Sequence, residues 1–168
     1  MRPVTVRTTV DAPREHVFNY LSDIANHAEF TDHFLKDFRL ERLDSRGVGA
    51  AARFRISSPL SAPLGLDVWA EAVFAELKPP YRIVVEGSGG RIGRTPIRAV
   101  YQLTKRDSDM TDVELTFSSE PASPADRFRE LLAGRVWLTL QWRRALRRMK
   151  WILEQGEPSA RAVRVAPG

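Results

Sequence analysis

The sequence predicts an α+β fold in which a bent antiparallel sheet of six to seven strands wraps around one long C-terminal helix. Apolar residues between Phe34 and Pro121 recur mainly at every second position, which is typical of half-buried strands. Between Ser123 and Gln155 they recur at the helical repeat instead. A helix of that length must bury its apolar face against something large, and the predicted sheet is that surface.

The N-terminal segment predicts one strand and two short helices. Val4 to Val10 alternates as a strand that places Val4, Val6, Thr8 and Val10 on one face. The run Asp11 to Glu15 then combines an acidic residue, a proline and a glutamate, as helix starts do. A second short helix is expected from Ala25 to Phe30. Helices this short leave no room for a parallel crossover, so the sheet should be antiparallel.

Six further strands follow, separated by segments rich in glycine, proline, serine and aspartate. The expected strands are Lys36–Leu43, Ala50–Ser57, Leu66–Lys78, Tyr81–Gly87, Pro96–Lys105 and Asp112–Pro121. A bent sheet around one helix is the natural way to cover both apolar faces. Such a sheet encloses more volume than the helix fills, so we expect an internal cavity.

The predicted C-terminal helix has two different faces. Its apolar arc consists of Phe128, Leu131, Leu138, Trp142, Ala145, Leu146, Met149 and Leu153, with Arg135 as the charge in its middle. Its opposite arc consists of Arg143, Arg144, Arg147, Arg148 and Lys150, with Trp137, Leu140 and Trp151 among them. Residues 122–168 carry 10 Lys/Arg and 4 Asp/Glu, a net +6, so they hold all of the chain's +5 excess. We expect the apolar arc to face the sheet.

Length and composition indicate one domain over residues 1–156, followed by a flexible tail at 157–168. A chain of 168 residues suits a single core. It contains no cysteine, which excludes disulfides and thiolate chemistry. No apolar run approaches the ~18 residues that cross a bilayer, and the first residues do not resemble a signal peptide. We therefore expect a cytoplasmic protein.

Three segments carry a family resemblance. Val10 to Asp23 resembles the "V-x-A-P-x-E-x-V-F" opening of the START-like (SRPBCC) superfamily and the Asp that ends its first helix. Gly49 to Arg55 is similar to its "G-x-G-A-R-F-R" strand, and Glu76 to Ile83 to its "E-x-x-P-P-x-x-I" hairpin. The resemblance implies a helix-grip fold, similar to birch-pollen allergens, that holds a lipid, sterol or polyketide between sheet and helix. The most similar branch comprises polyketide cyclases/dehydrases and coenzyme-Q-binding proteins.

Two positions depart from those relatives. With Trp69 aligned to the tryptophan of the aromatic polyketide cyclases, Glu71, Val73 and Ala75 follow, and the cyclases' arginine is missing. His27 stands where relatives usually carry a tryptophan. No position carries over as a catalytic residue, so the resemblance implies the fold more strongly than an activity.

An aromatic lining predicts the ligand site. The inward positions expected on strands and helix are Phe54, Trp69, Tyr101, Phe117, Leu138 and Trp142. Rings with a few polar groups form small-molecule pockets, although they can also fill a closed core. Glu71 joins them if its strand places Trp69, Val73 and Leu77 inside. In the opposite facing, Glu71 is solvated and Val68, Ala70 and Phe74 pack inside. Arg135 either orients a polar ligand group or reaches the rim and solvent.

Other chemistries have little support in the sequence. His16, His27 and His33 form no ligand-spaced cluster, so we expect surface or half-buried histidines and no metal site. No Gly-x-Ser-x-Gly motif is present. The glycine-rich stretch at 87–93 precedes a strand rather than a helix, which argues against phosphate binding. We expect no cofactor.

These observations favour a binding protein for a hydrophobic or aromatic molecule, lipid-, quinone- or polyketide-like, oriented by Tyr101, Glu71 and Arg135. The first alternative is a cyclase or dehydratase of polyketide-like substrates with Glu71 or Tyr101 as acid or base. The second is an interaction factor whose basic helix face, Arg143 to Lys150, docks on a membrane, ribosome or protein. Nucleic acid is disfavoured because the rest of the chain is slightly acidic.

Overall fold

The computed structural model describes residues 3–57, 68–89, 95–120, 135–155 and 164–165. Strand β1 (Val4–Val10) leads into α1 (Arg14–Leu21), the 3₁₀ turn η1 (Ile24–Asn26) and α2 (His27–Thr31). Six strands follow: β2 (Leu35–Leu40), β3 (Ala51–Ile56), β4 (Val68–Lys78), β5 (Arg82–Gly89), β6 (Thr95–Asp107) and β7 (Met110–Ser119). The described part ends with helix α4 (Arg135–Gln155) and strand β8 (Arg164–Val165). The start predicted for the last helix, Ser123 to Asp126, lies outside these residues.

The sheet confirms the predicted topology. Its order is β1-β7-β6-β5-β4-β3-β2-β8, and every pairing among the first seven strands is antiparallel. Strand β8 adds to β2 in parallel, with Arg39 opposite Arg164 and Leu40 opposite Val165. The sequence predicts no strand there, because two residues carry no readable period. The turn between β4 and β5 contains a cis Pro79–Pro80 peptide.

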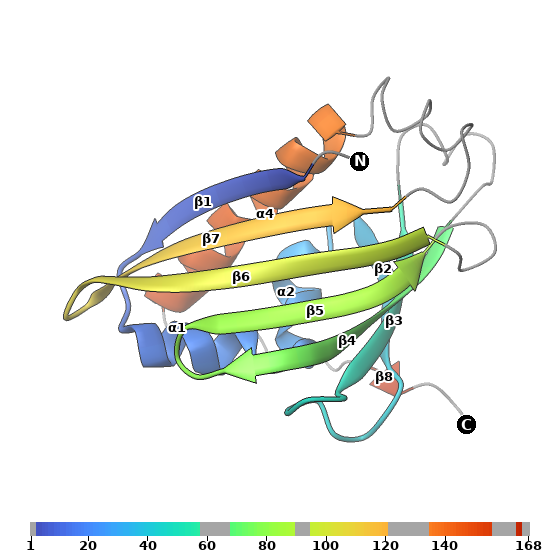
Figure 1. The fold of residues 1–168 in the computed structure, drawn as a ribbon, viewed down its shortest axis with the longest axis horizontal. Coiled ribbons are helices and arrows are strands. Elements are labelled where there is room, and N and C mark those ends of the chain that lie inside the picture. Colours follow the sequence, from blue (N-terminus) through green and yellow to red (C-terminus); the bar gives the residue numbers. More distant parts are fainter. Residues whose placement is uncertain (1–2, 58–67, 90–94, 121–134, 156–163, 166–168) are drawn as a thin grey trace.

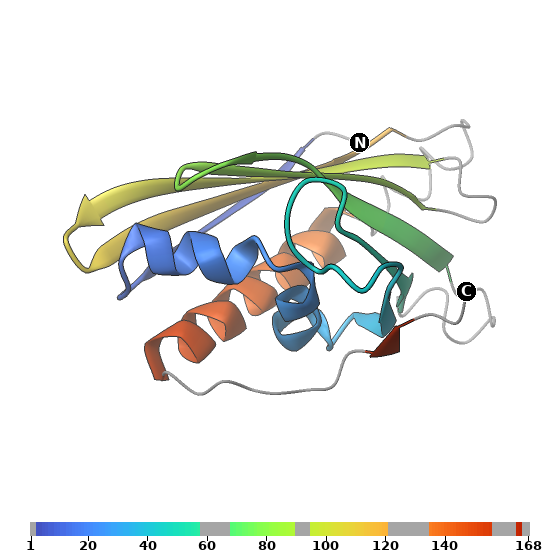
Figure 2. The same cartoon turned by 90° about the horizontal axis from the view of Figure 1, so that it is seen from below.

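All the helices lie on one side of the sheet (Figure 1). Figure 2 shows the sheet as one layer that curls towards α2 at its β3–β2 end, with α1, α2 and α4 beneath it. The helices cover the face of the sheet on which the apolar side chains lie. Successive side chains of a strand point to opposite faces, and Val4, Val6 and Val10 of β1 are buried on the helix side. Ala145, Leu146, Met149, Ile152 and Leu153 of α4 are buried as well. In the described residues no helix is long and apolar enough to span a membrane.

Candidate ligand-binding cavity

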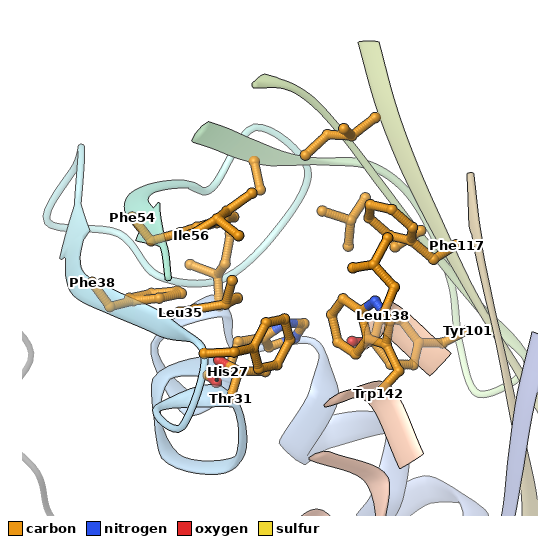
Figure 3. Close-up of a pocket in the computed structure, with 16 residues that line it drawn as sticks. His27, Thr31, Leu35, Phe38, Phe54, Ile56, Tyr101, Phe117, Leu138 and Trp142 are labelled. Carbon is orange, nitrogen blue, oxygen red and sulfur yellow. Dashed lines mark hydrogen bonds between the residues drawn. The ribbon is translucent and has the colours of Figure 1, made fainter. Parts of the chain in front are cut away.

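A cavity of about 70 Å³ lies between the concave face of the sheet, α2 and the N-terminal half of the described α4. Its lining comprises Ile24, His27, Thr31, Phe34, Leu35, Phe38, Phe54, Ile56, Ala72, Val85, Ile97, Ala99, Tyr101, Phe117, Leu138 and Trp142. Figure 3 shows Tyr101, Phe117, Leu138 and Trp142 facing Phe38, Phe54 and Leu35 across the space. Common ligand pockets measure roughly 300–1,000 Å³. The volume therefore suits a small ring compound.

Five of the predicted site residues meet at this cavity. Phe54 projects from β3, Tyr101 from β6, Phe117 from β7, and Leu138 and Trp142 from α4. The strand positions follow the alternation of buried and exposed residues, and the helical pair is one turn apart. Phe117 and Trp142 touch, with ring centroids 5.8 Å apart. Whether the five residues bind a ligand stays a prediction.

Trp69 and Glu71 do not face the cavity, and the prediction that they point inward is wrong. Both are exposed, while Ala70, Ala72 and Phe74 occupy the inner face of β4. The Arg53 guanidinium lies 5.1 Å above the Trp69 ring on the outer face, a cation–π contact that suits an exposed indole. The alternative facing described above is the one that the chain adopts. Glu71 is therefore excluded as an internal acid or base.

Arg135 is exposed at the start of the described part of α4 and is not part of the lining. Its carbonyl accepts a hydrogen bond from the Thr139 hydroxyl at 2.7 Å. Its position on the apolar arc does not bury Arg135 at the start of the described part of α4. The expectation that Arg135 orients an internal ligand is not supported, and its solvent-facing alternative holds.

The lining includes a wall that sequence reasoning missed. It consists of His27, Thr31, Phe34, Leu35 and Phe38, from α2 through the first half of β2. Spacings of three and four residues over this stretch are the signal that could have revealed it. The signal is weak because the backbone changes from helix to strand within the stretch. Only the tertiary structure brings the segment against α4.

His27 is the most informative of these residues. It is 8% exposed, which corrects the expectation of a surface or half-buried histidine. Its Nε2 lies 2.8 Å from the Leu21 carbonyl oxygen, and a carbonyl only accepts, so Nε2 carries the proton. Burial lowers the pKa of His27 to about 4, against the smaller opposing effects of this hydrogen bond and of Asp23. The ring is therefore neutral at pH 7, and its Nδ1 presents a lone pair.

Two more polar groups of the lining have no hydrogen-bond partner among the described residues. One is the Tyr101 hydroxyl, on a residue that is 1% exposed; burial raises the pKa of Tyr101, so the phenol stays protonated. The other is the indole Nε1–H of Trp142, which is buried and unpaired. The Thr31 hydroxyl, in contrast, donates to the His27 carbonyl oxygen. Among the described residues, the lining thus combines apolar side chains with three polar groups that lack a partner, and it includes no charged side chain.

The outer face of α4 forms a separate candidate surface. Arg143, Arg144 and Arg147 are exposed and have no carboxylate partner in the described part of the chain. Val136, Leu140 and Trp151 lie among them and are 70%, 55% and 56% exposed. The other two basic residues of the predicted face serve the fold. Arg148 pairs with Asp32, and Lys150 pairs with Glu154 at 3.1 Å and donates to the Thr9 carbonyl at 2.8 Å.

No group of three or more potential ligands, His, Cys, Asp or Glu, is positioned to hold a metal ion among the described residues. His33 Nε2 lies 3.2 Å from the Gln141 carbonyl oxygen, His27 is buried beside Leu21, and His16 is exposed. The three histidines of the chain therefore have separate environments.

A curved antiparallel sheet that holds a C-terminal helix, with a cavity between them, defines the START-like (SRPBCC) class and confirms the predicted superfamily. The family model described as "Activator of Hsp90 ATPase homolog 1-like protein" matches residues 11–154, and the chain belongs to this family within the class. The comparison with curated proteins gives no match.

Solved structures with similar folds include proteins from three bacteria. The ZhuI aromatase/cyclase from Streptomyces sp. R1128 has a TM-score of 0.68 at 16% identity, over 96% of this chain and 99% of that one. TTHA0849 from Thermus thermophilus has a TM-score of 0.66 at 14% identity, over 92% and 99%. DR_A0006 from Deinococcus radiodurans has a TM-score of 0.60 at 22% identity, over 92% and 99%. Identities this low establish the shared fold.

Proposed function

We propose that this chain binds a small, uncharged, hydrophobic or aromatic molecule in the cavity between the sheet and α4. The observation that carries the proposal is the lining itself. In the part of the chain that the structure describes, it is apolar except for His27, Thr31, Tyr101 and Trp142 and contains no charged residue. Removing a ring from water contributes roughly 25 cal/mol per Å² of apolar surface. A charged ligand would lose its hydration without gaining an ion pair, so the site favours neutral molecules.

The relationship to START-like proteins supports a binding or cyclase-type role, and the site favours binding. Of the two acid–base candidates from the sequence, Glu71 is outside the cavity and Tyr101 is inside. Since burial raises the pKa of Tyr101, its phenol is a hydrogen-bond donor at neutral pH rather than a proton acceptor. Catalysis at this site would therefore have to rely on uncharged donors and on the neutral His27 ring.

Filling the cavity tests the proposal. Ala72 lines the cavity and Ala75 is exposed on the same strand. In Ala72→Leu the added side chain occupies ligand space, so binding of single-ring aromatic probes, measured by NMR titration, should fall at least tenfold. Ala75→Leu is the matched control and should bind as the parent does. If Ala72→Leu binds normally, or if no aromatic or lipid probe binds the parent, the proposal is wrong.

The arginine face of α4 supports a second candidate function, docking on an anionic membrane surface. Arg143, Arg144 and Arg147 have no carboxylate partner among the residues described. They alternate with exposed Val136, Leu140 and Trp151, as in helices that lie in a lipid interface. Reversing Arg144 and Arg147 to Glu should abolish cosedimentation with phosphatidylglycerol vesicles. Lys105→Glu, at an exposed position of β6, is the control for a charge reversal elsewhere. Equal sedimentation of both variants and the parent would leave the face merely solvated.

A further inference from the structure

The polar groups of the cavity indicate what its ligand must offer. His27, Tyr101 and Trp142 are 8%, 1% and 7% exposed, and each lines the cavity. Leaving a buried donor or acceptor without a partner costs about 1–3 kcal/mol. In the described part of the chain the buried Nε1–H of Trp142 has no hydrogen-bond partner, and neither the Tyr101 hydroxyl nor His27 Nδ1 has one. In a core that only had to be closed, the buried indole N–H would be a net loss, and a bound molecule that hydrogen-bonds to it removes that loss.

The three groups differ in the kind of hydrogen bond that they need. His27 donates through Nε2 to Leu21, so its Nδ1 can only accept. The indole of Trp142 can only donate, while the Tyr101 hydroxyl can do both. The rings of His27 and Tyr101 meet edge-on with centroids 5.7 Å apart, and Figure 3 shows Tyr101 extending from the sheet towards His27. The His27 and Tyr101 rings therefore lie at the same end of the cavity.

Candidate ligand groups can be compared against this inventory. A hydrocarbon satisfies none of the three. A ketone or quinone oxygen accepts from Tyr101 or Trp142 and leaves His27 Nδ1 unpaired. A carboxylate or an ammonium group is charged, and the described residues of the lining offer no counter-charge. A hydroxyl group donates one hydrogen bond and accepts another, so of the groups compared it is the one that pairs with His27 and with a donor at once.

The geometry points to a phenol as the ligand: a small aromatic ring whose hydroxyl donates to His27 Nδ1 and accepts from Tyr101 or Trp142. This inference rests on the cavity binding proposed above and narrows it to one chemical class. The aromatic walls formed by Phe34, Phe117 and Trp142 suit a flat ring. The volume of about 70 Å³ favours a single ring over a fused polycycle.

Three probes of similar size separate the possibilities in NMR titrations of the full chain. p-Cresol donates and accepts, 4-methylcyclohexanone only accepts, and 4-fluorotoluene does neither to a useful degree. We expect p-cresol to bind about tenfold more tightly than 4-fluorotoluene, since a site with buried polar groups rejects an analogue that leaves them unpaired. The ketone should fall between them.

Two variants test the assignment. Tyr101→Phe removes one hydroxyl and keeps the ring, so it should weaken p-cresol binding severalfold and leave 4-fluorotoluene unchanged. Tyr20→Phe is the matched control, because the Tyr20 hydroxyl donates to Glu29 at 3.0 Å and is not part of the lining. It should leave the ratio of the two affinities unchanged.

The outcomes are distinguishable from those of the proposed function. If p-cresol, the ketone and 4-fluorotoluene bind equally, the phenol inference is overturned and binding of a hydrophobic molecule stands. If none of the probes shifts the resonances of residues lining the cavity, both are overturned. A stronger preference for the ketone than for p-cresol would also overturn the inference, because it would mean that His27 Nδ1 does not contact the ligand.

Discussion

His27 should make the stability of this protein depend on pH in a window set by its burial. The ring is neutral in the folded protein because burial lowers its pKa to about 4, whereas an exposed histidine has a pKa of 6.5. As the pH falls below 6.5, His27 becomes protonated in the unfolded chain, whereas in the folded chain it stays neutral until the pH approaches about 4. The free energy of unfolding therefore falls between pH 6.5 and about pH 4 and changes no further below it through this group.

The size of the effect follows from the two pKa values. Their separation, from 6.5 to about 4, at about 1.4 kcal/mol per pH unit, gives about 3 kcal/mol. That is a large share of the roughly 5–15 kcal/mol typical of whole domains. Carboxylates also titrate near the lower end of this window, and burial lowers the pKa of His33 as well. The contribution of His27 must therefore be isolated by difference.

His27→Gln isolates it, because the glutamine amide is neutral at every pH and can still donate to the Leu21 carbonyl. Urea unfolding of both proteins at pH 7, 6, 5 and 4 gives the two stability curves. We expect the free energy of unfolding of the parent to fall by about 3 kcal/mol more than that of the variant between pH 7 and pH 4. Parallel curves would refute the reasoning, since they would show that His27 titrates alike in the folded and unfolded chains.

Other substitutions test the packing and the strand facing. Gly87→Ala would place its Cβ 1.9 Å from the Glu71 carbonyl oxygen, so we expect the free energy of unfolding in urea to fall by about 3 kcal/mol or more. Gly89→Ala is the control and should lower it less, because its Cβ would lie 3.3 Å from the Ala70 side chain. Leu146→Ala removes a side chain that is 1% exposed, and should lower the free energy of unfolding by about 3 kcal/mol; a change below about 1 kcal/mol would contradict its burial. Glu71→Gln should change both stability and p-cresol affinity by less than about 0.5 kcal/mol, as calorimetry can check, because this side chain is exposed.

The sequence by itself determined the order of elements, the antiparallel sheet and the buried arc of the last helix. Alternation in Val4–Val10 and helical spacing through Leu146 and Met149 are local patterns, and each one states which face is apolar. Five of the eight residues predicted to line the site do so for the same reason. The bounds of the strands differ by a few residues from those expected, because strand ends depend on pairing partners.

Only the tertiary structure decided the facing of β4, where both faces carry apolar residues. Trp69 and Val73 are alternatives to Ala70 and Phe74, and the folded sheet places Ala70, Ala72 and Phe74 on its inner face. The same holds for His27, which a local pattern cannot bury. Its burial results from packing against Phe30, Phe74 and Tyr101, two of which lie on other elements far along the chain. The burial, charge state and hydrogen-bonding role of His27 all depend on those contacts. The sequence alone therefore could not predict the polar end of the cavity.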